Sequence, residues 1–262
     1  TMLEAREAAP RTHWHRQLHS YVTRLWWHCY AFQVLENQPE MERQALVPEM
    51  EQLSRPMDMA RFDAWRLGRT GWPMVDACMR FLHHHGWLNF RMRAMLVTTA
   101  THTLSLPWRP VADWLSQMFV DFEPGIHYTQ IQMHSCMAAS PVLRLYNPVT
   151  QARELDPQGE FVRRWVPELA AVSGEWIVMP WAMPATLRHR FGLEGTADYP
   201  IPLVDFEQMH RAVKAEISAL RSSLGLHAAP GFNERSRQGA SSRRTTAPKQ
   251  VNVQPSTQIS LF

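Results

Sequence analysis

Apolar positions along the chain recur at the three- and four-residue spacing of amphipathic helices, and no stretch alternates as a strand would. Residues 14–36 carry an aromatic-rich series without Gly or Pro, which predicts a buried helix. Its apolar members are Leu18, Tyr21, Leu25, Trp26 and Phe32. Pro73 and Gly86 bracket a second helix, and a third follows to make a hairpin. Further apolar stripes at 111–119 and 206–220 complete an all-α prediction.

Composition divides the chain into two segments. Residues 1–226 hold most of the large apolar side chains and are predicted to form one helical domain. Residues 227–262 are rich in Ser, Arg, Gln, Thr, Ala and Pro, the composition of a disordered tail. The net charge of +3 comes from this tail, so any nucleic-acid contact on the domain requires a local arginine cluster.

Several classes of protein are excluded by motif and spacing. Cys29, Cys78 and Cys136 are an odd set without C-x-x-C spacing, so no disulfide framework or cysteine metal site is predicted. The histidines at 83–85 point about 100° apart on a helix and cannot meet one ion, so no metal is predicted. No apolar run approaches about 18 residues and the start is not signal-like, which favours the cytoplasm.

A series of landmarks then follows in order: Thr70–Ala77, Gly86–Arg93, Asp121–Glu123, Arg144–Pro148, Asp156–Gly159 and Arg164–Leu169. Together they resemble the flavin-binding half of the DNA photolyase and cryptochrome family. The resemblance implies an all-α bundle that holds FAD non-covalently and performs light-driven electron transfer beside a DNA-binding hole.

The resemblance assigns several residues to the cofactor. Arg93 and Asp121 match the family's paired Arg and Asp beside the isoalloxazine ring, although an ordinary buried ion pair is the structural alternative. His127 falls next to flavin N5, where the family has Asn or Asp, and a His there would make the radical state pH-sensitive. Tyr21, Phe122 and Glu123 complete the implied FAD contacts.

Electron supply departs from the family pattern. Trp108 matches the middle member of the family's tryptophan chain, which implies a role in electron transfer. Ile131 stands where the flavin-proximal Trp is expected, so the usual route is interrupted. Tyr128 and Trp114 are candidate substitutes, and packing explains them equally well.

The segment Thr23–Tyr30 resembles the helix that faces the DNA lesion, where a damaged base is flipped out of the duplex. Arg24 replaces its Glu, His28 replaces its Arg, and Phe90 replaces an Asn further along. The DNA-binding residues that the resemblance implies are Arg24, Trp27, His28, Trp87, Phe90, Arg91 and Gln151.

Two features lie at the ends of the sequence. The family's Ser/Thr-rich segment that holds the flavin pyrophosphate, and its N-terminal antenna domain, have no counterpart here; truncation or a reduced flavin domain would explain this. The last five residues resemble the pentapeptide that binds the bacterial sliding clamp, with Gln258, Leu261 and Phe262 as the contacts.

These matches predict an FAD-binding, photolyase-like flavoprotein that couples light-driven electron transfer to DNA repair, and if active a deoxyribodipyrimidine photo-lyase. The alternatives are a non-catalytic blue-light receptor or DNA-repair accessory module, and a vestigial fragment without cofactor. Arg24, Phe90 and Ile131 differ where lesion recognition and electron supply are decided, so flavin binding is the firmer prediction.

Overall fold

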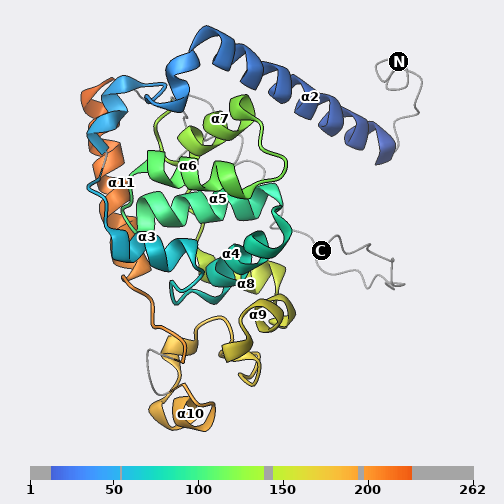
Figure 1. The fold of residues 1–262 in the computed structure, drawn as a ribbon, viewed down its shortest axis with the longest axis vertical. Helices are drawn as coiled ribbons and strands as arrows, with labels where there is room; N and C mark the ends of the chain where they lie inside the picture. The colour runs from blue at the N-terminus through green and yellow to red at the C-terminus, as the bar shows by residue number, and fades with distance from the viewer. Residues whose placement is uncertain (1–12, 54, 139–143, 194–197, 226–262) are drawn as a thin grey trace, which may run out of the picture. The chain divides into compact units, whose positions relative to one another are not determined.

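A computed structural model describes residues 13–53, 55–138, 144–193 and 198–225 (Figure 1). These residues contain helices and no strand, so the all-α prediction is confirmed. The α-helices are α2 (His13–Asn37), α3 (Met59–Arg66), α4 (Pro73–His85), α5 (Phe90–Thr98), α6 (Trp108–Met118), α7 (Pro124–His134), α8 (Pro148–Leu155), α9 (Glu160–Trp165), α10 (Ala185–Arg190) and α11 (Phe206–Ser223). The described ranges contain no helix long and apolar enough to cross a membrane. The predicted tail lies outside them.

Helix ends follow signals in the local sequence. Pro73 begins α4, and Gly86 ends it in the left-handed conformation at φ 66°. Side chains of Asn89 and Glu123 accept hydrogen bonds from backbone N–H groups in the first turns of α5 and α7. A π-helical turn, Thr99–Thr103, continues α5. The starting points of the two helices that line the candidate site are thus fixed by their own capping residues.

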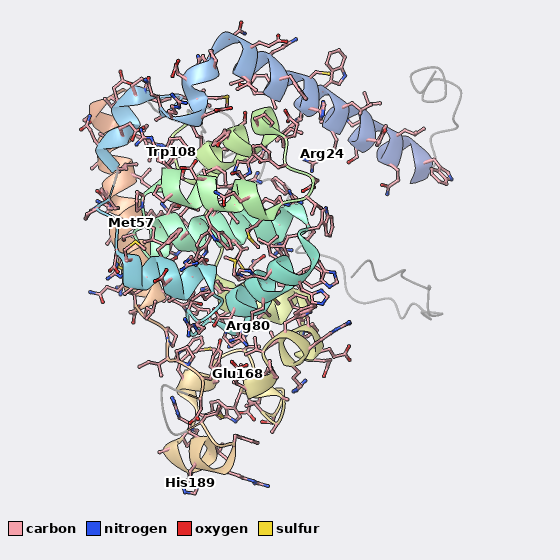
Figure 2. The ribbon with its side chains drawn as sticks, in the orientation of Figure 1. Arg24, Met57, Arg80, Trp108, Glu168 and His189 are labelled. Atoms are coloured by element: carbon pink, nitrogen blue, oxygen red, sulfur yellow. The ribbon has the colours of Figure 1, made fainter. Side chains whose placement is uncertain are left out.

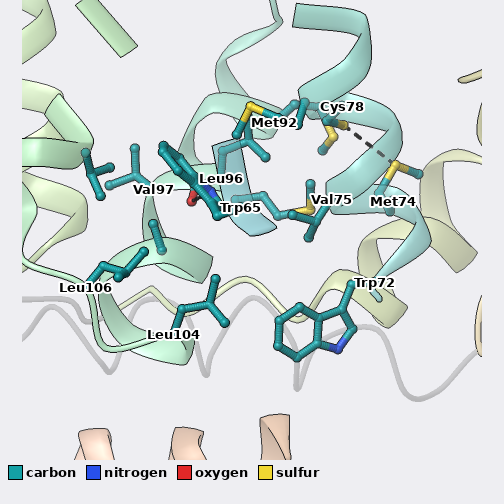
Figure 3. Close-up of a cluster of buried hydrophobic side chains, with 14 of the residues drawn as sticks. Trp65, Trp72, Met74, Val75, Cys78, Met92, Leu96, Val97, Leu104 and Leu106 are labelled. Carbon is teal, nitrogen blue, oxygen red and sulfur yellow. Dashed lines mark hydrogen bonds between the residues drawn. The ribbon is translucent and has the colours of Figure 1, made fainter. Parts of the chain in front are cut away.

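The centre of the core lies where α4 and α5 face one another (Figure 3). Val75 of α4 and Leu96 of α5 are fully buried, and so is Trp65 of α3. The Trp65 indole Nε1 donates a hydrogen bond of 3.1 Å to the Leu96 carbonyl, which satisfies the ring's polar atom inside the core. Trp72 and Trp108 are buried as well, so packing accounts for these three tryptophans.

The helix predicted at residues 14–36 exists as α2, but the prediction that it is buried is wrong. Val22 and Ala31 are buried, whereas Tyr21, Leu25, Trp26 and Phe32 are 37–68% exposed. α2 packs mainly on α7. A Cβ atom at Gly125 of α7 would lie 3.1 Å from the Ala31 carbonyl oxygen, so the two helices meet closely on one narrow stripe. The other faces of α2 are left to solvent.

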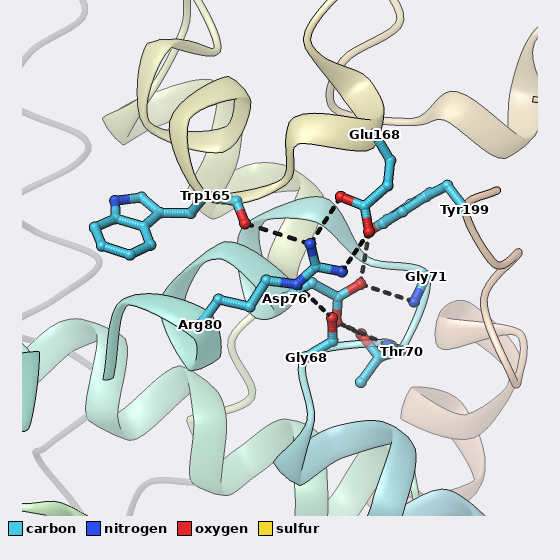
Figure 4. A network of polar contacts seen from close by, with 8 residues as sticks. All are labelled: Gly68, Thr70, Gly71, Asp76, Arg80, Trp165, Glu168 and Tyr199. Atoms are coloured by element: carbon cyan, nitrogen blue, oxygen red, sulfur yellow. Dashed lines mark hydrogen bonds and ion pairs between the residues drawn. The ribbon is translucent and has the colours of Figure 1, made fainter. Parts of the chain in front are cut away.

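Asp76 organises the start of α4 as a fully buried carboxylate (Figure 4). Its Oδ1 accepts hydrogen bonds from the Thr70 N–H at 2.8 Å and the Thr70 hydroxyl at 2.6 Å. Its Oδ2 accepts from the Gly71 N–H at 3.0 Å and the Tyr199 hydroxyl at 2.6 Å. Burial raises the pKa of Asp76, and these hydrogen bonds act in the opposite direction.

Arg80 continues this network toward α9. Its guanidinium donates to the Gly68 carbonyl at 3.0 Å and to both Glu168 carboxylate oxygens at 2.8 and 2.9 Å. Such a bidentate pair fixes direction as well as distance. Arg80 and Glu168 are also labelled in the wider view of Figure 2. The sequence landmark Arg164–Leu169 is therefore bound, through Glu168 and Arg80, to the helix that begins in the landmark Thr70–Ala77.

Tyr199→Phe should lower the free energy of unfolding by about 1–3 kcal/mol, because it removes one hydrogen bond from a buried carboxylate while keeping the ring. Urea denaturation measures the change. Tyr30→Phe is the matched control, since Tyr30 is 62% exposed and should change stability by less than about 0.5 kcal/mol. Equal effects of the two substitutions would show that the Asp76 network does not hold the fold.

Candidate functional site

A cavity of about 270 Å³ opens between α5, α7 and the segment that follows α6. Its walls are largely apolar and include Trp87, Phe90, Val97, Phe119 and Ile131. Its polar lining consists of Arg93, Asp121, His127, Gln130 and His134. An apolar cleft with a few converging polar groups is the usual form of a small-molecule or cofactor site, although this volume is slightly below the usual range of about 300–1,000 Å³. A planar ring system is the kind of ligand that it fits.

Arg93 and Asp121 form the charged end of the cavity. The Arg93 Nη2 lies 2.9 and 2.8 Å from the two Asp121 carboxylate oxygens, and its Nε donates to the Leu88 carbonyl at 2.7 Å. The guanidinium carbon also lies 4.0 Å from the Phe119 ring centroid, in cation–π contact. The predicted pair is thus present, with side chains 26% and 46% exposed.

This pair is not the buried ion pair that was the structural alternative. A pair so exposed stabilises a fold by less than about 1 kcal/mol. Among the described residues, the structure shows no hydrogen-bond partner for Nη1 of Arg93. The geometry therefore leaves a fixed cation with a donor to spare beside an apolar cleft.

His127 lines the same cavity from α7, with its ring edge-on to Phe122 at 5.1 Å between centroids. Its Nε2 is 3.0 Å from the Ala112 carbonyl oxygen. Burial lowers the pKa of His127 to about 4, so the ring is neutral at pH 7. A carbonyl only accepts, so Nε2 must carry the proton and Nδ1 is left as an acceptor.

The other residues predicted to bind the cofactor do not line the cavity. Phe122 packs against His127, and Glu123 caps α7 by accepting from the Gly125 and Ile126 N–H groups at 3.1 and 2.8 Å. Tyr21 lies on α2 and is 48% exposed. Roles for these three residues at FAD stay predictions.

Residues predicted to bind DNA fall into two groups. The Arg24 guanidinium lies 5.5 Å from the Trp27 ring and 6.0 Å from the Phe90 ring, which places α2 residues near the Phe90 end of the cavity. Arg91 instead pairs with Gln151 and Glu154 of α8. Of the remaining two predicted residues, Trp87 lines the cavity, and the His28 ring contacts the Phe32 ring within α2 in a tilted arrangement, with 4.6 Å between centroids.

Trp108 is buried at the start of α6, away from this cavity, and is labelled in Figure 2. It borders a separate space of about 20 Å³, and its indole Nε1 has no hydrogen-bond partner among the residues that the structure describes. That space is large enough for one water molecule and no larger ligand. Electron transfer through Trp108 stays a prediction.

Comparison with protein families decides the identity of this fold. The family model described as the FAD binding domain of DNA photolyase matches residues 21–219. The chain belongs to the DNA photolyase and cryptochrome family. FAD is accordingly the cofactor of this domain, as the resemblance predicted.

Individual relatives agree with this assignment. The chain is 34% identical to cryptochrome-2 of Arabidopsis thaliana, over 77% of this chain and 33% of that protein. It is 28% identical to the deoxyribodipyrimidine photo-lyase of Agrobacterium fabrum, over 84% of this chain and 49% of the relative. The chain therefore spans between a third and a half of these family members.

Solved structures share the helical arrangement. A class III photolyase from Agrobacterium tumefaciens superposes with a TM-score of 0.71 at 28% identity, covering 79% of this chain and 43% of that one. A cryptochrome from Synechocystis superposes with a TM-score of 0.73 at 26% identity, covering 82% and 44%. The similarity extends well beyond the sequence landmarks.

Sequence reasoning missed α7, and with it Gln130 and His134. The available signals were Glu123 followed by Pro124, a capping acid before a proline at the first helical position. The spacing of His127, Gln130 and His134, three and then four residues apart, also puts them on one helix face. The apolar periodicity that would predict this helix was weak, because the face that carries these three residues lines a cleft rather than the core.

Acidification should destabilise the protein through three buried histidines. Burial lowers the pKa values of His102, His127 and His134 from 6.5 to about 4. Between these pH values the unfolded chain binds more protons than the folded one, so the stabilising contribution is complete above pH 6.5 and is lost toward pH 4. In His127→Asn, the slope of unfolding free energy against pH should fall by up to about 1.4 kcal/mol per unit in this window, measured by urea denaturation. An unchanged slope would contradict the assignment.

Proposed function

We propose that this chain is the flavin-binding part of a light-driven flavoprotein that acts on DNA, with the flavin ring in the cavity between α5 and α7. The observation that carries the proposal is the Arg93–Asp121 pair at the mouth of an apolar cleft. The residues present fit the ring, because a cation with a spare donor suits electron-rich heteroatoms and the apolar walls suit flat faces. When bound, FAD would supply a light-absorbing centre that gives and takes single electrons.

The chain's own residues would position and tune that centre. Arg93, held by Asp121 and Leu88, is fixed before ligand arrives and would stabilise negative charge that develops on the ring. Neutral His127 would accept a hydrogen bond through Nδ1, which favours a protonated ligand nitrogen over an unprotonated one. Val97 and Phe119 would exclude water from the ring faces.

Contact with DNA is proposed at the Phe90 end of the cavity. The Arg24 guanidinium of α2 lies near the rings of both Phe90 and Trp27, and Arg24 and Trp27 offer a phosphate-binding cation and a stacking surface. The support is local charge, since the net charge of the chain outside its tail is near zero. A flipped pyrimidine dimer in DNA is the substrate class, and the activity is photo-lyase-like repair. A cytoplasmic location belongs to the same proposal.

Arg93→Leu should weaken FAD binding by about ten- to a hundredfold, because a hydrogen bond from a charged donor is lost beside the ring. Quenching of flavin fluorescence measures the dissociation constant. Arg91→Leu is the matched control on the same helix, since Arg91 pairs with Glu154 and does not line the cavity.

Equal losses of FAD affinity in the two variants would show that the flavin does not bind in this cavity. If the native chain does not bind FAD, the proposal is wrong.

To test repair, the FAD-loaded protein is illuminated with an oligonucleotide that contains a thymine dimer. Light-dependent restoration of the two thymines would support a repair function. If light restores no thymine, a photoreceptor function is left.

We infer in addition that the tail recruits the protein to the bacterial sliding clamp. Residues 258–262 lie outside the described residues, and the support is their sequence at the end of a polar tail. An extended peptide can place Leu261 and Phe262 in an apolar groove.

The double variant Leu261→Ala, Phe262→Ala should lose at least about tenfold in affinity for purified clamp, because two apolar anchors are removed. Surface plasmon resonance gives the dissociation constant, with Ser260→Ala as the control. Retention of native affinity by the double variant would remove the clamp from the account.

A further inference from the structure

The cavity has a second polar end that none of the predicted site residues accounts for. Gln130 and His134 lie four residues apart on α7, which makes them neighbours on one helix face. His134 follows His127 by seven residues, so it lies about 10 Å further along the helix axis. The Gln130–His134 end is therefore distinct from the charged end at Arg93 and Asp121.

Each of these side chains has a polar atom without a hydrogen-bond partner. The Oε1 atom of Gln130 and the Nε2 atom of His134 are buried, and no described residue forms a hydrogen bond with either. His134 is only 7% exposed. Within the described residues, the structure likewise shows no hydrogen bond for the Nε2 atom of Gln130 or the Nδ1 atom of His134. Buried polar groups are nearly always paired, so two orphans on one wall of a cleft indicate a missing hydrogen-bonding ligand.

The surroundings narrow the chemistry of that ligand. The Phe90 ring lies 5.8 Å from the His134 ring, and Val97 and Ile131 also line the cavity, so a flat ring is favoured. Burial, together with the nearby Arg144 cation, lowers the pKa of His134 to about 4, so the imidazole ring is neutral at pH 7. A neutral imidazole and an amide each offer one donor and one acceptor side. Each also has two nearly equivalent orientations about its last bond.

We propose that Gln130 and His134 bind the imide edge of a pyrimidine dione, whose C=O, N–H and C=O groups alternate as acceptor, donor and acceptor. Two sources carry this edge: the dione ring of a flavin, and a thymine or uracil base. The inference rests on the proposed function of the same cavity and names the group that the cavity recognises. Arg24, which lies 6.0 Å from the Phe90 ring, suits a phosphate attached to either source.

Methylation at N3 removes the imide donor and tests the inference chemically. The full-length chain, His134→Phe and Gln130→Met are titrated with lumiflavin and N3-methyl-lumiflavin, which need no pyrophosphate site. A second arm uses single-stranded oligonucleotides with one thymine or one N3-methylthymine. The native chain should bind the unmethylated probe of one arm about three- to tenfold more tightly than the methylated probe, and each variant should lose that preference.

If the native chain prefers the unmethylated lumiflavin, the group recognised is the dione ring of a flavin. If it prefers the unmethylated oligonucleotide, the group recognised is a thymine or uracil base. Equal affinity of the native chain for methylated and unmethylated probes in both arms would overturn the inference and leave flavin or DNA binding intact. Failure of the native chain to bind any probe would overturn the proposed function together with it. A preference that survives in both variants would assign the recognition to other residues.

Thermal unfolding of the ligand-free protein provides a second readout. His134→Phe should raise the melting temperature by roughly 2–4 °C, because it replaces a buried orphan nitrogen by an apolar ring of similar size. His19→Phe, at an exposed position of α2, is the matched control and should change it little. A lower melting temperature in His134→Phe would show that the imidazole already supports the fold and would contradict a ligand-binding role.

Discussion

The guanidinium of Arg93 is the fixed point on which the site depends. It donates hydrogen bonds to the Leu88 carbonyl, which precedes its own helix, and to both oxygens of Asp121, and it makes a cation–π contact with the Phe119 ring. Three contacts from three directions leave the planar group little freedom. The end of α6, the segment that carries Asp121 and the start of α5 are thereby held around one cation, and the cavity opens beside it.

α7 forms the opposite wall of the cavity, and two residues at its start determine its position. Glu123 caps its first turn, and Gly125 permits the close approach of α2. From that start, His127, Gln130 and His134 fall on the cavity side. The rigid Asp76 and Arg80 network at the start of α4 stands apart from this cleft and explains why some of the most distinctive sequence landmarks are structural (Figure 4).

Sequence predicted the fold where apolar periodicity reports directly on burial. α4 and α11 appear as their stripes and caps require. α2 has nearly the predicted bounds, yet its aromatic residues are exposed, because a periodic pattern shows helix and not which faces find a neighbour. The candidate site was predictable in part. Arg93, Asp121 and His127, which the resemblance assigns to the cofactor, line one cavity, and their contact with FAD stays a prediction.

The rest of the site could not be predicted, for physical reasons. Glu123 is a helix cap in this structure, and a spacing match alone cannot distinguish a capping carboxylate from a cofactor ligand. Gln130 and His134 face a cleft rather than a core, so they leave no apolar signal in the sequence. They stand out because Oε1 of Gln130 and Nε2 of His134 have no hydrogen-bond partner in the described part of the chain, which only the three-dimensional structure shows.

The central claim is that the flavin ring lies between α5 and α7 with Arg93 and Asp121 at one end. A crystal structure of the full-length chain grown with FAD tests this most directly. The account predicts electron density for the isoalloxazine ring in that cavity, within hydrogen-bonding distance of the Arg93 guanidinium. Flavin density at another location, with the cavity filled only by solvent, would contradict it.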